Sequence, residues 1–288
     1  MLGILLIDKP LGITSHDVVN TVRRRFGTRR VGHAGTLDPL GTGLLVVAVG
    51  PATRFLQYLP LEPKEYDAHV TFGRATNTQD AEGEIVSEAP VPEELEQRLV
   101  EVLPNFVGAI RQLPPMFSAV KKAGKPLYVY ARKGEEVERA TREVYIEAID
   151  LLEVAGEVAH LRVVCSGGTY IRTLAHDVGE AVGCGAFLSS LNRTGVGRFK
   201  LEGAVKLDDA GPEHLLPLRE ALDPMPVIEL DSHRVAHVRE GRQVGIRPSP
   251  AEPRVAVATP DGDVFGIAKV FGPLLQPEVV IPSEVAAP

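Results

Sequence analysis

Asp38 stands in a segment whose composition suits chemistry on a bound ligand. It lies within the run VGHAGTLDPLGTG, residues 31–43, which contains four glycines and one proline. Pro39 favours an extended backbone at Asp38, and the glycines let the loop approach a ligand closely. A carboxylate placed in this way can act as an acid, a base or a nucleophile, although an aspartate in a loop more often bonds its own backbone. The surrounding sequence has to decide between these two interpretations.

The loop around Asp38 lacks the motifs of common cofactors and metals. No lysine followed by serine or threonine comes after its last glycine, which excludes a phosphate-binding loop, and no GxGxxG joins a strand to a helix. Cys165 and Cys184 are the only cysteines, too few for a four-cysteine metal site. We therefore expect no metal and no cofactor, so that side chains alone carry the reaction. Cleavage of a glycosidic bond is a natural candidate, and since no second carboxylate has a comparable context, we favour a one-carboxylate mechanism over that of a glycoside hydrolase.

Short elements on both sides must hold this loop in place. The sequence predicts a strand over 3–10, a helix that is capped by Thr14 or Ser15 and ends near Gly27, and a strand directly after the loop. Residues 31–43 are predicted to be loop throughout because of their glycines. This mixture of elements predicts an α+β protein. Further strands are predicted over 64–72, 83–86, 144–153 and 158–166, and further helices over 92–103 and 169–182.

Basic residues are concentrated in two blocks of an otherwise acidic chain. The formal net charge is −7, which for the whole chain argues against a nucleic-acid partner. Residues 1–60, however, contain seven Lys or Arg against three Asp or Glu, and residues 111–133 contain six against none. Because charge acts locally at physiological salt, these blocks can still bind a polyanion such as RNA. The residues predicted to contact RNA are Arg23, Arg24, Arg29, Arg30, Lys121, Lys122, Lys125, Arg132 and Lys133.

The chain gives no sign of membrane insertion or secretion. Its longest apolar run, Leu44–Val49, is far too short to span a bilayer, and Asp8 interrupts the N-terminal apolar stretch before a signal peptide could form. Together with the low cysteine content, this predicts a cytoplasmic protein. No self-complementary apolar patch is evident, so we expect a monomer.

Four longer runs resemble one enzyme family. They are GILLIDKPLGITSHDVVNTVRR, VGHAGTLDPLGTGLLVVAVG, QLPPMFSAVKKAGKPLYVYARKGEEV and CSGGTYIRTLAHDVGEAVGCGAFLSSLNRTGVGRF. In order and spacing they are similar to the TruB family of tRNA pseudouridine synthases, and together they cover most of residues 3–199. The resemblance implies an enzyme that isomerises uridine 55 in the T arm of tRNA to pseudouridine, with no cofactor, no metal and no obligate protein partner.

The resemblance also implies roles for particular residues. In the family the aspartate of the GTLDP run is the nucleophile, and that position is Asp38 here. The YIR run at the start of the helix over 169–182 supplies a tyrosine and an arginine. The implied catalytic residues are Asp38, Tyr66 and Arg172, and the implied substrate-binding residues are His33, Tyr66, Tyr170 and Leu191.

These residue types suit the reaction. The target base has to leave its stack, and an aromatic face such as Tyr66 can offset part of that cost. A guanidinium about 4–6 Å from Asp38 would lower the pKa of the carboxyl by about 1–3 and keep it ionised, which is the role expected of Arg172. Asp38 could attack C1′ of the ribose, attack C6 of the uracil, or help to remove a sugar proton, and the sequence does not choose among these. Tyr66 could accept the C5 proton only if its pKa of about 10 is lowered.

The resemblance implies two domains. A catalytic domain over residues 1–222 would have an antiparallel-rich mixed sheet, flanking helices and an RNA-binding cleft, with an insertion at about 115–142 that grips the RNA. Residues 223–288, whose alternating runs flank the Asp-Gly pair at 261–262, would form a small PUA-like β domain. Two alternatives stay open: a guide-RNA-dependent synthase similar to dyskerin, and a non-catalytic chaperone that folds the T arm. The lysine-rich insertion favours a stand-alone enzyme over the guided one, and Asp38→Asn separates an enzyme from a chaperone.

Overall fold

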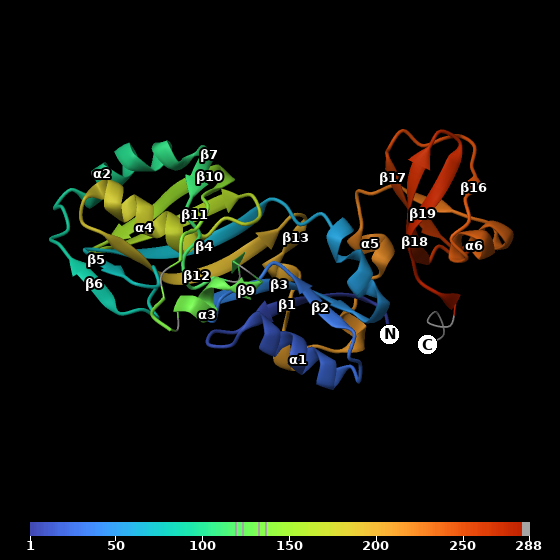
Figure 1. Ribbon diagram of the computed structural model, residues 1–288, viewed down its shortest axis with the longest axis horizontal. Coiled ribbons are helices and arrows are strands. Elements are labelled where there is room, and N and C mark those ends of the chain that lie inside the picture. Colours follow the sequence, from blue (N-terminus) through green and yellow to red (C-terminus); the bar gives the residue numbers. More distant parts are fainter. Residues whose placement is uncertain (119, 123, 132, 136, 284–288) are drawn as a thin grey trace.

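The two large β sheets of the protein lie along an elongated molecule, with the smaller of them at one end (Figure 1). The structure is a computed structural model that describes residues 1–118, 120–122, 124–131, 133–135 and 137–283. The smaller sheet is formed by strands within residues 227–280. Among the described residues, no helix has the length and apolar character that crossing a bilayer requires.

The larger sheet has ten strands and is mostly antiparallel. Within the described residues its parallel pairs are β1 with β14 and β3 with β12. The predicted α+β fold with an antiparallel-rich mixed sheet is confirmed. The main path runs β14 (Val205–Lys206), β1 (Gly3–Lys9), β3 (Gly41–Val49), β12 (Ala186–Val196), β4 (Lys64–Phe72), β11 (Val158–Cys165), β10 (Arg142–Ala155) and β7 (Gly108–Gln112), while β2 (Val31–Ala34) pairs with β3 and β13 (Phe199–Lys200) pairs with β12.

The alternating sequence of β4 shows why this sheet forms. Along KEYDAHVTF, the side chains of Tyr66, Ala68, Val70 and Phe72 are buried and alternate with half-buried ones. Because successive residues of a strand point to opposite faces, this pattern places an apolar row on one face of the sheet. Helices α2 and α4 cover that face and share one hydrophobic cluster with β4. β4 has the predicted bounds, 64–72.

Helix α1 begins where its sequence predicts. The Thr14 hydroxyl accepts a hydrogen bond from the Asp17 N–H, and the Asp17 carboxylate accepts one from the Thr14 N–H. This reciprocal capping satisfies N–H groups at the helix start that have no partner within the helix. The helices are α1 (Ser15–Arg25), α2 (Leu95–Val102), α3 (Leu127–Ala131), α4 (Ile171–Val182), α5 (Leu218–Ala221) and α6 (Ser232–Arg239), with 3-10 helices η1 (Gly50–Tyr58), η2 (Leu103–Phe106), η3 (Leu201–Gly203), η4 (Leu207–Asp209) and η5 (Pro212–His214).

The loop around Asp38 is shorter than its sequence predicts. Residues 31–34 form β2 because their backbone pairs with Val46–Val49 of β3, and β3 itself begins at Gly41. The prediction of loop throughout 31–43 is therefore wrong at both ends, and the loop covers 35–40. Gly43 is required where it stands, since its φ is +89° and an added Cβ would lie 2.3 Å from the side-chain oxygen of Asn192 in β12.

A strand in the middle of the larger sheet has no counterpart among the predicted elements. β12 pairs with β3 on one side and with β4 on the other. Its sequence, AFLSSLNRTGV, places polar residues where a central strand would normally be apolar. Ser189 donates to the carbonyl of His69, and Arg193 donates to that of Leu44, so these polar groups are satisfied inside the sheet. Because these hydrogen bonds allow polar residues inside the sheet, β12 lacks the apolar pattern by which a central strand is predicted from sequence.

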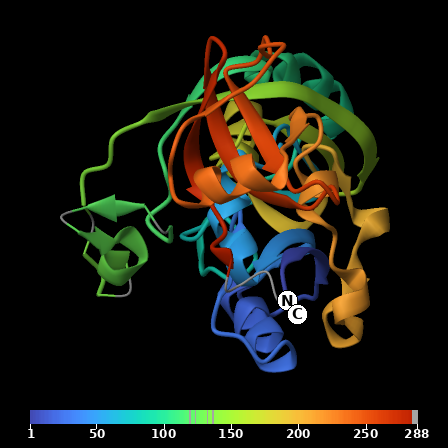
Figure 2. The same cartoon turned by 90° about the vertical axis from the view of Figure 1, so that its right-hand side faces the viewer.

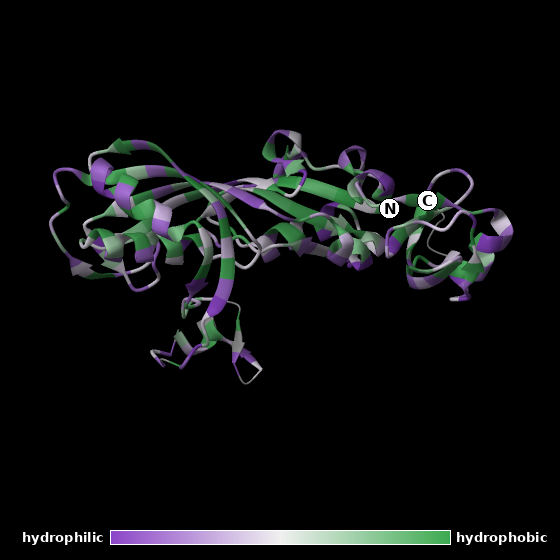
Figure 3. Ribbon diagram, turned by 90° about the horizontal axis from the view of Figure 1, so that it is seen from above, coloured by the Kyte–Doolittle hydropathy of each residue, from purple (hydrophilic) through white to green (hydrophobic). Residues whose placement is uncertain are grey.

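The described residues between β7 and β10, which are 113–118, 120–122, 124–131, 133–135 and 137–141, project from the larger sheet as an arm (Figures 2 and 3). We call this segment the insertion arm. It contains a short hairpin of β8 (Lys121–Lys122) and β9 (Lys125–Pro126), followed by α3. A second hairpin, of β5 (Arg74–Thr76) and β6 (Ile85–Glu88), forms a two-stranded sheet of its own, and Asp80 in its connection pairs with Leu188 of β12.

The C-terminal β domain shares a hydrophobic core with the larger sheet. Phe55 of η1 and Val46 of β3 belong to the same buried cluster as Ala256 and Ile267 of the smaller sheet. The predicted hairpin turn at Asp261 and Gly262 connects β17 and β18. The strands of the smaller sheet follow the order β15 (Val227–Glu229), β17 (Arg254–Ala258), β18 (Val264–Phe271), β19 (Leu274–Val280) and β16 (Val244–Gly245).

Phe55→Ala is expected to lower the free energy of unfolding by about 3–5 kcal/mol, because the ring is fully buried in this shared core. Urea unfolding followed by circular dichroism measures the change. Phe271→Ala is the matched control, since Phe271 is 58% exposed and its loss should change the free energy by about 0.5 kcal/mol or less. Two separate unfolding transitions, with only one of them shifted by Phe55→Ala, would contradict a shared core.

Candidate active site

The loop of residues 35–40 forms one wall of a cavity of about 220 Å³. The other walls come from β4, from the start of α4, from β12 and from the insertion arm. The sequence names six residues for catalysis and substrate binding, and the fold brings five of them to this cavity although they lie far apart in the chain. These five are Asp38, Tyr66, Tyr170, Arg172 and Leu191.

Arg172 holds two carboxylates and one carbonyl at the cavity. Its Nη2 lies 3.0 Å from Oδ2 of Asp38, and its Nη1 lies 3.1 Å from Oδ2 of Asp80. Nη2 also donates to the carbonyl of Phe117 at 2.7 Å. Arg172 and Asp80 are buried, whereas the side chain of Asp38 is 46% exposed and open to a ligand. Within the described part of the chain, no three His, Cys, Asp or Glu side chains are grouped as a metal site would need.

The pKa of Asp38 is raised above the usual aspartate value of 3.8, mainly by burial and also by the nearby Asp80. Arg172 and Lys9 act in the opposite direction but do not outweigh these effects. The expected pairing with Arg172 is present and acts to lower the pKa as predicted, but burial and the charge of Asp80 outweigh it, so the pKa is raised overall. A carboxylate with a raised pKa is more basic, which favours a nucleophile as long as it stays ionised.

Tyr66 lines the cavity from β4 and is buried. Burial raises the pKa of its phenol, although the neighbouring Arg193 acts to lower it. Tyr66 could accept the C5 proton only with a lowered pKa, and the fold does not meet that condition. The flat aromatic ring of Tyr66 can still stack on a base, whatever the pKa of its phenol.

Tyr170 is fixed at the N-terminus of α4 by the side chain of Gln112. The amide of Gln112 donates to the carbonyl of Tyr170 at 3.2 Å and accepts from its N–H at 3.0 Å, and Gln112 is fully buried. The ring of Tyr170 faces two guanidinium groups, with the Cζ atoms of Arg142 and Arg172 at 5.4 and 5.8 Å from its centroid. These distances suit cation–π contacts, so Tyr170 connects the Asp38 site to β10.

His33 lies on β2, outside the residues that line the cavity. Burial lowers the pKa of its imidazole, as does the charge of Arg193, so the ring is neutral at neutral pH. Its Nδ1 is buried and has no hydrogen-bond partner among the described residues. The predicted contact of His33 with the substrate therefore has no support from the lining of this cavity.

The basic residues predicted to contact RNA lie on two separate surfaces. One surface is the end of α1 and the residues after it, and the other is the insertion arm. Arg23 is partly used within the fold, since it donates to the carbonyl of Val31. The side chain of Lys121 and all of Arg132 lie outside the described residues. Exposed members of the two sets are Arg24, Arg29 and Arg30 on the first surface and Lys122, Lys125 and Lys133 on the second.

Sequence reasoning missed three charged residues next to the cavity: Asp80, Lys64 and Arg193. Asp80 accepts hydrogen bonds from the Thr78 hydroxyl and from the N–H of Glu82 and is buried, although its run TNTQDAEG looks like a polar connection. Lys64 lines the cavity, and its position two residues before Tyr66 on a strand could have revealed it. Arg193 is fully buried, and no sequence signal distinguishes it from an exposed strand arginine.

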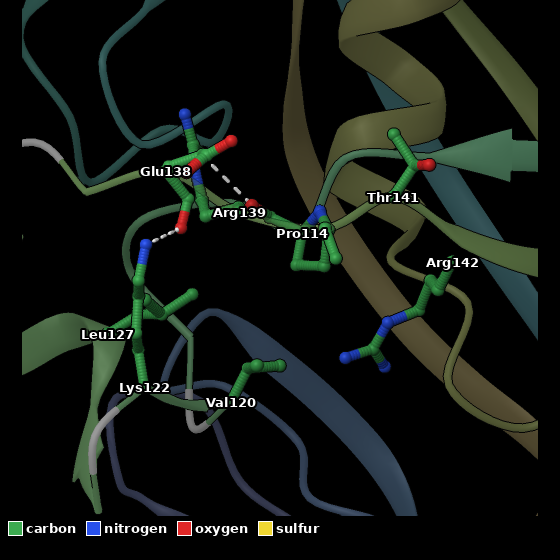
Figure 4. A pocket seen from close by; sticks show the side chains of 9 residues that line it. Pro114, Val120, Lys122, Leu127, Glu138, Arg139, Thr141 and Arg142 are labelled. Carbon is green, nitrogen blue, oxygen red and sulfur yellow. Dashed lines mark hydrogen bonds between the residues drawn. The ribbon is translucent and has the colours of Figure 1, made fainter.

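A larger cavity of about 620 Å³ lies where the insertion arm meets β10 (Figure 4). Its lining combines the cationic Lys122 and Arg142 with the apolar Val120 and Leu127. Lys122 donates to the carbonyl of Glu138, which ties the hairpin of the arm to the chain that leads into β10. Because Arg142 also faces Tyr170, the two cavities are neighbours.

The chain is similar to known pseudouridylate synthases. Residues 23–171 match the family model described as TruB family pseudouridylate synthase (N terminal domain), and residues 172–225 match that of the tRNA pseudouridylate synthase B C-terminal domain. The tRNA pseudouridine synthase B of Cupriavidus metallidurans is 45% identical over 97% of this chain and 94% of its own length. That of Dechloromonas aromatica is 47% identical over 85% of this chain and 84% of its own.

Solved structures with the same fold cover nearly the whole chain. A chain in the crystal structure titled as a Cbf5-Nop10-Gar1 complex superposes with a TM-score of 0.71 and is 28% identical, over 98% of this chain and 86% of that one. A chain in the structure of an H/ACA RNP bound to a substrate RNA that contains 2′-deoxyuridine also has a TM-score of 0.71, at 25% identity over 97% and 85%.

Proposed function

The chain belongs to the TruB family and is a tRNA pseudouridine synthase, and from this premise we propose that it isomerises uridine 55 in the T arm with Asp38 as the nucleophile. The pairing of Asp38 with Arg172 at 3.0 Å, on the wall of a cavity that Tyr66 and Leu191 also line, is the observation that supports the proposal. An ionised carboxylate that is aimed by a buried guanidinium and open on its other side has the placement of a nucleophile.

In this proposal the reaction needs no co-reactant, because it is an isomerisation. The uridine leaves its stack and enters the cavity, where the ring of Tyr66 offers a stacking face. With Asp38 attacking C1′, the N1–C1′ bond breaks as the carboxylate forms an ester at C1′, and the detached uracil then turns and forms the C5–C1′ bond as the ester breaks. The C5 proton leaves and N1 gains a proton. Attack at C6 and removal of a sugar proton are the two other routes open to the same carboxylate.

The basic surfaces fit a tRNA partner. Exposed arginines at the end of α1 and just after it, and exposed lysines of the insertion arm, lie at two places that can bind phosphates of the tRNA. We propose that the protein acts on tRNA as a monomer in the cytoplasm, without an obligate protein partner. Its 45–47% identical relatives are named tRNA pseudouridine synthase B, which supports tRNA as the substrate. We also propose that the catalytic domain comprises residues 1–222, with an insertion at about 115–142 that contacts the RNA, and that the PUA-like β domain comprises residues 223–288.

Incubation of the purified protein with an unmodified tRNA transcript, without ATP, metal or guide RNA, tests this function. Pseudouridine is mapped by carbodiimide-stop sequencing, and one new stop at uridine 55 is expected. A transcript with cytidine at position 55 is the control and should give no stop. Tight tRNA binding without product would contradict a stand-alone synthase and would favour a guided enzyme or a T-arm chaperone.

The rate is expected to fall on acidification at a pH above the range of an ordinary aspartate, because Asp38 has to be ionised and its pKa is raised. In Asp80→Asn this acid limb should move to lower pH, since one of the groups that raise the pKa of Asp38 is then absent. Single-turnover rates measured against pH for both proteins give the comparison. An acid limb that stays in place or moves to higher pH in Asp80→Asn would contradict the coupling of the two carboxylates.

A further inference from the structure

The Asp38 loop is fixed from outside by the segment that joins β1 to α1. The hydroxyl of Ser15 donates to the carbonyl of Leu37 at 2.8 Å and accepts from the Leu37 N–H at 2.8 Å. On the other side of Asp38, the carbonyl of Pro39 accepts from the N–H of Gly12 at 2.9 Å. Both chain neighbours of the carboxylate are therefore bound to residues 12–15.

We propose that Ser15 is a positioning residue, which sets the place of the Asp38 carboxylate by holding both backbone groups of Leu37. This inference rests on the proposed role of Asp38. It gives a role to Ser15, which neither the family resemblance nor the cavity lining includes. Ser15 does not contact the cavity, so it acts on the reaction only through the backbone before Asp38.

Ser15 is free for this task because its neighbour does the capping of α1. Thr14 is the N-cap and exchanges hydrogen bonds with Asp17, whereas the Ser15 hydroxyl turns to the Leu37 backbone. A serine at the start of a helix usually bonds the helix itself. Ser15 differs from an ordinary helix-start serine because its hydroxyl bonds the backbone of Leu37 instead of the helix.

The surroundings of Ser15 make the link rigid. Ser15 is 2% exposed and Leu37 is 3% exposed, so water cannot replace either hydrogen bond. α1 is anchored by Val18 and Val22 in one hydrophobic cluster, while Leu37 belongs to another. The buried Nζ of Lys9 donates to the carbonyls of Pro10 and Ile13 and so closes the turn that carries Gly12. The hydroxyl of Ser15 thus connects a fixed helix to the loop that carries the nucleophile.

Removal of the hydroxyl should act on the chemical step more than on tRNA binding. A displacement of about 1 Å at a reacting group can reduce a rate by about 10²-fold. Ser15→Ala is therefore expected to lower the single-turnover rate at saturating enzyme by about 10²-fold and to leave the Kd for tRNA within about twofold. Ser15→Thr, which restores a hydroxyl at the same position, should recover most of the rate.

Thr14→Ala is the matched control, because it removes the neighbouring hydroxyl that caps α1 and does not touch Leu37. It should lower the thermal midpoint and leave the single-turnover rate within about threefold. If Ser15→Ala does not fold, Ser15→Cys carries the test, since the slightly larger thiol fills the same place but forms weaker hydrogen bonds, and its rate should lie between those of Ala and wild type.

The outcomes separate this inference from the proposed function. An inactive Asp38→Asn together with a Ser15→Ala rate as high as that of Thr14→Ala would overturn the positioning role alone. A slow Ser15→Ala whose Kd for tRNA weakens by the same factor would also overturn it, because the loss would then lie in binding. Activity in Asp38→Asn would overturn the proposed function itself, and the role of Ser15 with it.

Discussion

Asp38→Asn is expected to reduce pseudouridine formation by about 10⁴-fold or more, because an amide cannot form the covalent bond that a carboxylate nucleophile forms. The side chain keeps its size and its position beside Arg172, so tRNA binding should stay within about threefold of wild type. Product is measured under single-turnover conditions by carbodiimide-stop sequencing, and binding is measured by filter retention of labelled tRNA.

Asp67→Asn is the matched control for this variant. Asp67 follows Tyr66 on β4 and points to the opposite face of the sheet, so its loss should leave the rate unchanged. Product from Asp38→Asn at the wild-type rate would mean that a different group attacks the nucleotide. Loss of binding in step with activity would mean that Asp38 serves recognition rather than chemistry.

The same variant should not lose stability at neutral pH. The pKa of Asp38 in the folded protein is raised, so folding favours the protonated form. That contribution to stability is present below the unfolded pKa and is lost as pH rises through the folded pKa. At pH 7 the ionised carboxylate therefore costs stability, and the neutral asparagine avoids that cost. Urea unfolding should show Asp38→Asn at least as stable as wild type at pH 7, and a clear destabilisation there would contradict the direction of the pKa.

Arg172→Lys is expected to lower the single-turnover rate by about 10²-fold although the positive charge is retained. The guanidinium reaches Asp38 and Asp80 with two different nitrogens, at 3.0 and 3.1 Å. An ammonium is a single point and cannot hold both carboxylates in the same geometry. With lysine, a positive charge would still balance the Asp38 carboxylate, but the carboxylate would no longer be held in one orientation.

Stability should fall in the same variant, because Arg172 and Asp80 are both buried. Disruption of a buried ion pair costs about 3–5 kcal/mol when one charge is left without a partner, and a cost near the lower end is expected here since lysine keeps a positive charge. Arg162→Lys on the exposed part of β11 is the matched control and should change neither rate nor stability. A rate for Arg172→Lys within about threefold of wild type would show that charge alone suffices.

Much of the fold could be predicted because its patterns are local. The alternation in β4 and the reciprocal capping by Thr14 and Asp17 are readable from neighbouring residues, and both elements lie where the sequence places them. β2 and β12 could not be predicted in this way. β2 forms because it pairs with β3. The polar side chains of β12 are buried because they form hydrogen bonds to other strands. Both features depend on segments that are distant in the sequence.

The same distinction applies to the site. Asp38 lies in a distinctive glycine-rich run, and Arg172 was predicted because its YIR run resembles that of the family. Asp80 could not be named, since it becomes important only when its hairpin turn meets α4 and shares Arg172. Burial, together with the charge of Asp80, raises the pKa of Asp38 although Arg172 acts to lower it. Electrostatics depends on every charge around a group, and a single sequence does not show which charges the fold assembles.

The cluster that joins Phe55 and Val46 to Ala256 and Ile267 limits how this protein can be recombined with its relatives. In a chimera whose C-terminal β domain comes from another parent, the two apolar surfaces at this contact would not be complementary in shape. Such a mismatch leaves voids or clashes in a packed interior. Although the two large sheets belong to different domains, the two sides of this contact have to be inherited together, and exchange is tolerated only where both sides come from one parent.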